Sequence, residues 1–216
     1  VNLQGRITHG CLGIWKDEHV AGLKKLADLI HGMNSKAAIQ IAHGGRKSSS
    51  QRPWEGGGPL GEADLKARGE GPWPIAASSS LPFDEGWPSP HMLTIEEIDG
   101  IVEDYRQAFR RAREAGFDVV ELHCAHGYLM HSFLSPLANN RNDEYGGSRE
   151  NRMRLPLRIA AVMRKEWPAG LPVFTRISSV DGVDIGWSIE DSVAFARELK
   201  SVGVDVIDCS SGGMKL

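Results

Sequence analysis

The feature that most constrains the fold of this chain is a repeated pairing of an amphipathic helix pattern with a short apolar, β-branched run. The pairing occurs four times, and only a few residues separate each helical pattern from the run that follows it. Helices and strands that alternate through short connections are typical of a parallel sheet covered by helices. The chain is therefore predicted to be an α/β protein.

The boundaries of these elements follow from capping residues and from Gly and Pro. A capping box of Thr94 with Glu97 opens the second helix, and Gly116 ends it. The expected helices cover about 17–33, 94–115, 149–167 and 188–202, and the expected strands cover 37–41, 118–123, 172–177 and 204–208.

Two local details of the helices are also predicted. Pro156 lies within the first two turns of the third helix, which favours a start slightly later than Ser148. The fourth helix begins at Ser188 with Asp191 in the capping position, and its apolar spacing predicts an inward face made of Ile189, Val193, Ala196 and Leu199.

The missing glycine fingerprint of dinucleotide-binding sheets favours a (β/α)8 TIM barrel over an open doubly wound sheet. A complete barrel needs eight strands and typically ~250 residues. The chain has 216 residues and begins at Val1, without an initiator Met. We therefore expect one domain over 1–216 that is an incomplete barrel, with the first strand and the last two strands missing from this chain.

A long segment at 44–90 interrupts the alternation and is rich in Gly, Pro, Ser and Trp. Loops of this length in a compact domain are usually functional lids or disordered segments. Because it follows a strand, it is expected over the C-terminal face of the barrel, where active sites occur. We interpret it as a lid, with a plain excursion loop as the alternative.

Composition excludes several classes of function. The formal net charge is −3, so no basic surface is available for nucleic acid, and the longest apolar runs are far shorter than the ~20 residues of a membrane helix. Cys11, Cys124 and Cys209 are too few and too widely spaced for a disulfide framework or an iron–sulfur cluster. A cytoplasmic protein without nucleic-acid or membrane partners is expected.

Polar residues at the ends of the expected strands are the candidates for chemistry. Gln40 and Arg176 each interrupt an apolar strand, and His123 closes another. A buried Arg requires an anionic or strongly accepting partner. An internal ion pair of Arg176 with Glu121 is one interpretation, and a satisfied amide at the barrel rim is the corresponding one for Gln40.

The densest cluster is the run from His123 to Tyr128, which brings two imidazoles and a phenol to a strand end. Two imidazoles can donate hydrogen bonds to one carbonyl oxygen, and a nearby phenol can supply a proton. His123 and His126 could instead be structural, or could bind zinc as a His-x-x-His pair. No third ligand is evident at a suitable spacing.

Longer strings resemble segments of the Old Yellow Enzyme family, in family order from end to end. The Arg-Lys pair after Ala-His-Gly-Gly and the His-x-x-His pairing resemble its bacterial branch of xenobiotic reductases and thermophilic-like ene reductases. The strings lie at residues 4–8, 13–15, 39–47, 52–55, 115–118, 123–129, 133–136, 143–148, 150–152 and 208–213.

The resemblance implies a role for each candidate residue. Gln40 resembles the glutamine that hydrogen-bonds the pyrimidine edge of FMN, and Arg176 resembles the arginine that faces flavin N1 and C2=O. His123 and His126 resemble the pair that holds the substrate carbonyl oxygen, and Tyr128 resembles the tyrosine that delivers a proton. No metal is implied.

The resemblance further implies an NADPH- or NADH-dependent ene reductase that acts on α,β-unsaturated carbonyl or nitro compounds, homo-oligomeric in its full-length form. The family's phosphate-binding strands are expected to be missing here. Two alternatives stay open: a truncated, inactive barrel fragment that serves as a structural or interaction unit, and a metal-assisted hydrolase that uses both histidines and Glu121. The related dienoyl-CoA reductase type adds a cysteine-ligated cluster whose cysteines are absent from the sequence.

Overall fold

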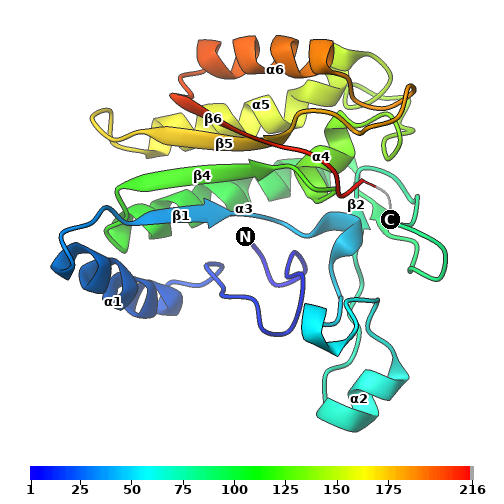
Figure 1. The fold of residues 1–216 in the computed structure, drawn as a ribbon, viewed down its shortest axis with the longest axis horizontal. Helices are drawn as coiled ribbons and strands as arrows, with labels where there is room; N and C mark the ends of the chain where they lie inside the picture. Colours follow the sequence, from blue (N-terminus) through cyan, green and yellow to red (C-terminus); the bar gives the residue numbers. More distant parts are fainter. Residues whose placement is uncertain (215–216) are drawn as a thin grey trace.

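A four-stranded parallel sheet forms the centre of the computed structural model, which describes residues 1–214 (Figure 1). The helices are α1 Glu18–Gly32, α2 Glu62–Arg68, α3 Ile95–Glu114, α4 Leu129–Leu134, α5 Arg149–Glu166 and α6 Ile189–Ser201, with short 3-10 turns η1 Gly45–Lys47 and η2 Pro53–Glu55. The strands are β1 Ala38–Ile41, β2 Ala76–Ala77, β3 His91–Met92, β4 Val119–Cys124, β5 Val173–Ser178 and β6 Val206–Ser210.

The strand order of the sheet is β1-β4-β5-β6, so the long strands are neighbours in the order of the chain. The helices between them contact one another in the same order, α1 with α3, α3 with α5 and α5 with α6, and they lie on one side of the sheet (Figure 1). A doubly wound sheet would have helices on both faces, whereas a barrel has them only outside. The arrangement is that of a curved section of barrel wall.

The core lies between the sheet and these helices. Alternate strand residues such as Leu122 and Val173 point toward the helices and are fully buried against side chains such as Phe109 and Ile159. The opposite set, which includes Ala38, Glu121 and Phe174, lines an open groove on the concave face. The α/β prediction and the four expected helix–strand pairs are therefore confirmed.

Two details of the helices differ from expectation. Helix α5 begins at Arg149, directly after its Ser148 cap, and continues through Pro156. The later start was wrong because Pro156 is itself buried beside Leu155 and Ile159, so tertiary packing outweighs the one lost backbone hydrogen bond.

The inward face of α6 was also predicted wrongly in part. Its buried residues are Ser192, Phe195 and Leu199, whereas Ile189 and Val193 are 51% and 46% exposed. The ring of Phe195 packs edge-on against Trp187, with 6.2 Å between the ring centroids. Burial of the larger aromatic ring sets the rotation of the helix about its axis.

The segment 44–90 begins where β1 ends and contains η1, η2, α2 and β2. Figure 1 shows it on the side of the sheet where the strands end, together with α4 and β2. Arg52 contacts both Glu55 and Glu70, and Arg68 contacts Asp64, so ion pairs hold the segment together. Within residues 1–214, no helix has the length and apolar character needed to cross a membrane.

Candidate active site

The register of the sheet gathers the predicted site residues at its C-terminal edge. Gln40 lies opposite Glu121, and Arg176 lies between His123 and Asp208. These five side chains belong to the concave face because strand residues alternate between the two faces. His123 and Glu121 thus lie on the same face of β4.

His126 and Tyr128 lie in the turn between β4 and α4, directly after His123. Nε2 of His123 is 3.3 Å from Nδ1 of His126, and Nε2 of His126 is 2.7 Å from Oγ of Ser210. The backbone N–H of Ala125 donates to Nδ1 of His123, which places the proton of that imidazole on Nε2. His123 therefore presents an N–H toward the second imidazole.

The Ser210 hydroxyl allows His126 to take either tautomer. It can accept from an Nε2–H, or it can donate to a bare Nε2 while the proton sits on Nδ1. In the second state, an oxygen placed between the two rings would receive hydrogen bonds from both His123 and His126. The pair is thus able to bind one carbonyl oxygen with two neutral donors.

The two imidazoles are neutral because of their surroundings. His123 is 5% exposed, and burial, with the nearby His126 and Arg176, lowers its pKa to about 3. Burial also lowers the pKa of His126, and the positive charges of Arg176 and Lys47 act in the same direction. Both rings remain uncharged at neutral pH.

The turn that carries His126 has an unusual backbone. His126 has φ +58° and Gly127 has φ +74°, both in the left-handed region. The His126 N–H donates to Ser178 Oγ at 2.9 Å, and Lys47 Nζ donates to the carbonyls of His126 and Gly213 at 3.0 and 3.2 Å. Contacts from three other segments hold a conformation that a non-glycine residue rarely adopts.

Gly127 is required at its position. A Cβ there would lie 2.1 Å from the carbonyl oxygen of Gly213, and a Cβ on Gly213 would lie 2.5 Å from the Cα of His126. The backbones after β4 and β6 therefore touch without intervening side chains.

Tyr128 lies against the imidazole of His123, with 5.1 Å between the ring centroids. The ammonium of Lys47 is 5.1 Å from the centre of the Tyr128 ring. Burial raises the pKa of the Tyr128 phenol, so it keeps its proton at neutral pH. A protonated phenol beside the imidazole pair is a suitable proton donor.

Gln40 reaches across the concave face, where its amide nitrogen donates to Glu121 Oε2 at 2.5 Å. That contact uses the nitrogen side of the amide and leaves its oxygen free to accept. Burial raises the pKa of Glu121, and the hydrogen bond from Gln40 partly opposes this rise.

Arg176 pairs with Asp208 rather than with Glu121. Its Nε lies 3.4 Å from Asp208 Oδ2, and this buried nitrogen has no hydrogen-bond partner within residues 1–214. The alternative interpretation, an ion pair of Arg176 with Glu121, is not found, because Glu121 lies one step lower on the concave face, opposite Phe174. A cation that is only loosely paired remains beside the imidazoles.

Several residues that shape this site were not singled out from the sequence. Lys47 and Asp208 were quoted only within longer strings, and Ser178 and Ser210 were given no role. Lys47 could have been found because it follows β1 in a glycine-rich turn at the strand ends. The serines lie at the last positions of β5 and β6.

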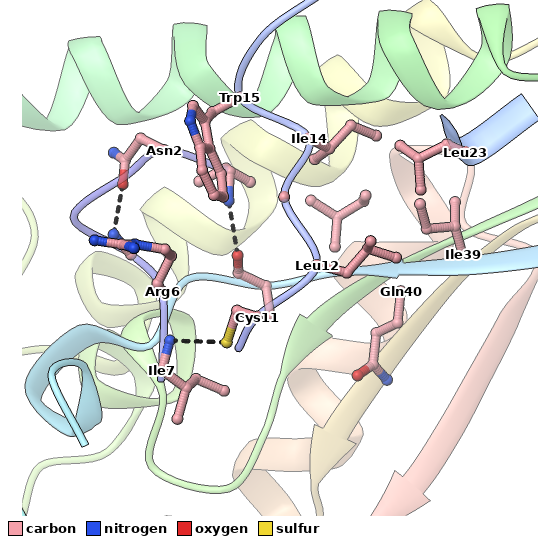
Figure 2. Close-up of a pocket in the computed structure, with 15 residues that line it drawn as sticks. Asn2, Arg6, Ile7, Cys11, Leu12, Ile14, Trp15, Leu23, Ile39 and Gln40 are labelled. Atoms are coloured by element: carbon pink, nitrogen blue, oxygen red, sulfur yellow. Dashed lines mark hydrogen bonds between the residues drawn. The ribbon is translucent and has the colours of Figure 1, made fainter. Parts of the chain in front are cut away.

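A separate enclosed pocket lies between the N-terminal segment and β1 (Figure 2). Apolar side chains such as Ile14, Leu23 and Ile39 line most of it, and Gln40 stands at its edge. Its volume is about 170 Å³, below the roughly 300–1,000 Å³ typical of ligand sites. We interpret it as a packing gap.

A zinc site was the competing interpretation of the histidine pair. Over the described part of the chain, no group of three or more His, Cys, Asp and Glu side chains is arranged to hold a metal ion. Glu121, the proposed third ligand, is instead bonded to Gln40.

Comparison with known proteins places this chain within a class of barrel-fold flavoproteins that carry out redox chemistry. The chain belongs to the NADH:flavin oxidoreductase / NADH oxidase family, which it matches over residues 1–214. The family is FMN-dependent and uses a nicotinamide reductant, which agrees with the resemblance to Old Yellow Enzymes.

Individual relatives agree with this assignment. NADPH dehydrogenases of Bacillus velezensis and Bacillus subtilis are each 45% identical over 214 residues, 99% of this chain and 56% of theirs. Among solved structures, morphinone reductase in complex with tetrahydroNAD is 31% identical, with a TM-score of 0.74 over 91% of this chain and 55% of that one. A 2-naphthoyl-CoA reductase complex is 29% identical, with a TM-score of 0.78 over 97% and 31%. The chain spans about half the length of the curated relatives it matches.

The residues of the concave face fit the family's cofactor. The buried Nε of Arg176 has no hydrogen-bond partner within residues 1–214, so the half-buried guanidinium can still donate to an electron-rich heterocycle. Gln40 lies on the same face and offers a free amide oxygen. The donor Arg176 and the acceptor oxygen of Gln40 suit the edge of a pyrimidine ring, which carries both acceptors and donors.

Proposed function

We propose that this chain supplies the substrate-binding and pyrimidine-side part of an FMN-dependent ene reductase that reduces the C=C bond of α,β-unsaturated carbonyl or nitro compounds. The observation that carries the proposal is the pair of neutral imidazoles, His123 and His126, 3.3 Å apart beside a protonated Tyr128. NADPH or NADH is the proposed source of electrons, in keeping with the relatives' names.

In this proposal, Arg176 and Gln40 hold the pyrimidine side of FMN. The fixed charge of Arg176 would favour electron density on the adjacent ring nitrogen and oxygen. When bound, FMN supplies the chemistry of accepting a hydride from the nicotinamide and passing one to the substrate.

The histidines act on the substrate oxygen. Hydrogen bonds from His123 Nε2–H and His126 Nδ1–H would stabilise the negative charge that develops there, each worth about 3 to 4 kcal/mol when well aimed. Because both rings are neutral, they donate without first losing a solvating counterion. Tyr128 is then placed to give its proton to the α carbon.

The segment 44–90 is proposed to cover this site as a lid. Its first turn already reaches the site, since Lys47 bonds to the carbonyl of His126. Phe83, near its far end, packs against the Lys47 ammonium at 4.4 Å from the ring centre. Both ends of the segment therefore contribute to the wall around the histidines.

Two further expectations remain proposals. A cytoplasmic location is supported by the free state of Cys11, Cys124 and Cys209, which suits a reducing compartment. Assembly as a homo-oligomer rests on the family resemblance.

The test is an absorption spectrum of the purified protein after FMN is added and the excess removed. A retained flavin band that bleaches with NADPH and returns with cyclohexenone would support the ene reductase. Retained flavin that bleaches but does not return with enones or nitroalkenes would overturn the substrate class.

The second candidate function is an inactive structural or interaction unit. The open groove on the concave face favours it. Failure of the protein to retain any flavin would support this alternative.

A further inference from the structure

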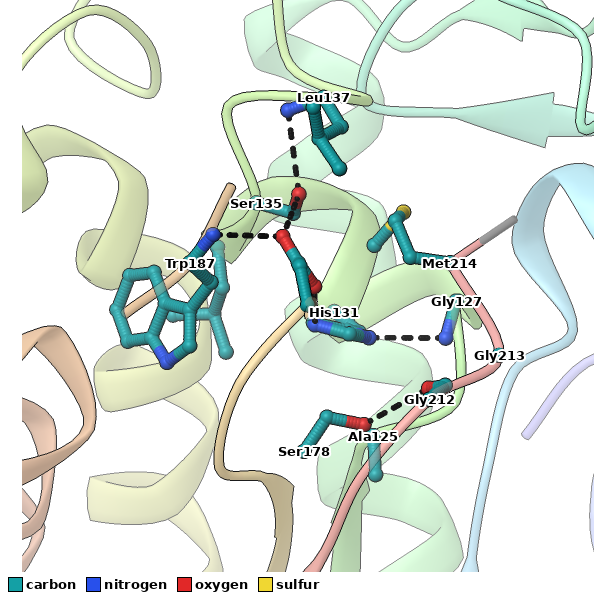
Figure 3. Close-up of polar contacts among 12 residues, drawn as sticks. Ala125, Gly127, His131, Ser135, Leu137, Ser178, Trp187, Gly212, Gly213 and Met214 are labelled. Carbon is teal, nitrogen blue, oxygen red and sulfur yellow. Dashed lines mark hydrogen bonds and ion pairs between the residues drawn. The ribbon is translucent and has the colours of Figure 1, made fainter. Parts of the chain in front are cut away.

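A second imidazole–carboxylate pair lies behind the site histidines, in the interior of the protein. The side chains of His131 on α4 and Asp181 in the connection after β5 are both fully buried, with 3.0 Å between His131 Nε2 and Asp181 Oδ1. The two atoms lie within ion-pair distance but do not have the geometry of a hydrogen bond, and neither has another hydrogen-bond partner within residues 1–214. Figure 3 shows His131 between the turn at Gly127 and Trp187. None of the roles assigned above uses this pair.

Asp181 is built to remain a carboxylate. Burial alone would raise its pKa, but the nearby His131 imidazole and hydrogen bonds from Ser135 and the backbone outweigh this effect, and the pKa lies below its ordinary value. Its Oδ2 accepts from the Ser135 hydroxyl at 2.6 Å and from the Trp187 N–H at 2.7 Å. Asp181 therefore offers Oδ1 as an acceptor to His131.

The other side of the His131 ring faces the site turn. Its Nδ1 accepts a hydrogen bond from the backbone N–H of Gly127 at 2.9 Å. An Nδ1 that accepts has no proton, so the proton of a neutral ring must lie on Nε2, toward Asp181. The carboxylate thus fixes the one tautomer that can receive the Gly127 N–H.

Charges on neighbouring elements are compatible with this state. The guanidinium of Arg46, after β1, and that of Arg152, on α5, are both close enough for Asp181 to raise their pKa values, although burial lowers them overall. The other titratable neighbours, His123 and His126, are themselves held neutral by burial. A proton on His131 Nδ1 would face the Gly127 N–H, which is also a donor, so the hydrogen bond between them would be lost.

We propose that His131 and Asp181 are positioning residues that set the left-handed turn at His126 and Gly127, and thereby aim the His126 ring at the substrate. Only the effect on substrate rests on the proposed function. Carboxylates that orient an imidazole through its far nitrogen serve this purpose in other active sites. Here the imidazole orients a backbone amide instead of a reacting atom.

Two substitutions of His131 separate its contact with the Gly127 N–H from its contact with Asp181. In His131→Asn, the amide oxygen reaches the former position of Nδ1, so the acceptor for Gly127 is kept and the contact with Asp181 is lost. In His131→Gln, the amide group reaches the former position of Nε2, so the contact with Asp181 is kept and the Gly127 acceptor is lost. Asp181→Asn tests the choice of tautomer with His131 in place.

The first measurement is the hydrogen exchange rate of the Gly127 amide in the FMN-treated protein. We expect His131→Gln to accelerate exchange about tenfold or more and His131→Asn by less than about threefold, because an amide without its acceptor opens more easily. Asp181→Asn should lie between them. His91→Gln is the control, because it alters an exposed imidazole–carboxylate pair of similar geometry.

The second measurement is kcat/KM for cyclohexenone reduction. We expect His131→Gln to lose about tenfold or more, because a small misplacement of a catalytic group is expensive, while flavin retention stays unchanged. His131→Asn should recover most of that loss. This rescue would not occur if the ring only filled space.

Equal acceleration of Gly127 exchange in the Asn and Gln variants, or none in the Gln variant, would overturn the positioning role whatever the activity. The expected exchange pattern in a protein that does not reduce enones would uphold the positioning of the turn and refute the proposed function. Loss of the folded state in His131→Gln leaves the decision to Asp181→Asn, in which unchanged Gly127 exchange would refute the proposal.

Discussion

The turn after β4 and the concave face of the sheet are adjacent, but their polar groups are hydrogen-bonded to very different degrees. In the turn, His126, Gly127 and Tyr128 are held by Lys47, Ser178, Ser210 and His131. On the concave face, the polar contacts of Gln40 and Arg176 within residues 1–214 are those with the adjacent carboxylates, Glu121 and Asp208.

The turn is therefore preorganised, whereas the polar groups of the concave face are only loosely paired. Donors that are fixed before the substrate arrives need no reorganisation during the reaction, which is the condition for strong electrostatic catalysis. The half-buried Arg176 keeps a donor free for an electron-rich group. This difference supports our proposal that the turn binds the substrate and the concave face binds FMN.

The largest effect should come from His123→Ala, which removes one donor of the pair. We expect kcat/KM for cyclohexenone to fall about 10² to 10³-fold, because one well-aimed donor is lost. The retained flavin absorbance should change little. His91→Ala, on the exposed surface, is the control. Equal losses of flavin and activity would show that the two regions are not separable.

The next effect is on stability, from Gly127→Ala in the turn. A Cβ on Gly127 would meet the Gly213 carbonyl at 2.1 Å in a backbone with φ +74°. We expect a loss of about 2 to 4 kcal/mol in the free energy of unfolding, measured by denaturant titration.

The matched control for this change is Gly100→Ala. Gly100 lies within α3, and a Cβ there has open space. The same substitution should stabilise the protein by about 0.5 to 1 kcal/mol, because Ala favours the helix. A similar loss at both positions would argue against a strained turn.

A smaller effect is expected from Arg176→Met on the concave face. The variant should bind FMN about 10- to 30-fold more weakly, because a charged hydrogen bond worth about 1.5 to 2 kcal/mol is removed. Quenching of FMN fluorescence measures this affinity. Arg106→Met, which alters an exposed pair with Glu103, should bind FMN as the parent does. Unchanged affinity in Arg176→Met would remove the concave face from the cofactor site.

The smallest effect is a dependence of stability on pH. The pKa of His123 is about 3 in the folded protein, against ~6.5 when unfolded. The unfolded chain therefore takes up the proton first. The stability from neutral His123 is complete above pH 6.5 and is lost as the pH falls toward 3.

Denaturant titrations between pH 6.5 and 4.5 test this dependence. His123→Asn should reduce the slope of stability against pH by roughly 1 kcal/mol per pH unit. His43, whose pKa is also about 3, should behave in the same way when changed to Asn. An unaltered slope in His123→Asn would indicate a solvated imidazole.

The sequence was sufficient for the elements that depend on local patterns. Helices α3 and α6 begin at the expected caps Thr94 and Ser188. Strand alternation puts Glu121 and His123 on one face of β4. The errors at α6 and Pro156 arose where packing against distant residues outweighed local preference.

The detailed site could not be predicted in the same way. The partner of Arg176 depends on strand register. Asp208 lies directly opposite Arg176, whereas Glu121 lies opposite Phe174. The left-handed conformation of His126 depends on Gly213, Lys47 and His131, which belong to other parts of the chain. Such contacts become visible only when the segments are brought together in space.

The direct backbone contact between Gly127 and Gly213 also bears on the order in which the protein is made. During synthesis, the turn at His126 leaves the ribosome long before Gly213 does. Until β6 and the residues after it have docked, Lys47 cannot bridge the carbonyls of His126 and Gly213. His126, which we propose binds the substrate, therefore reaches its final orientation only after β6 has docked, although it follows the earlier strand β4.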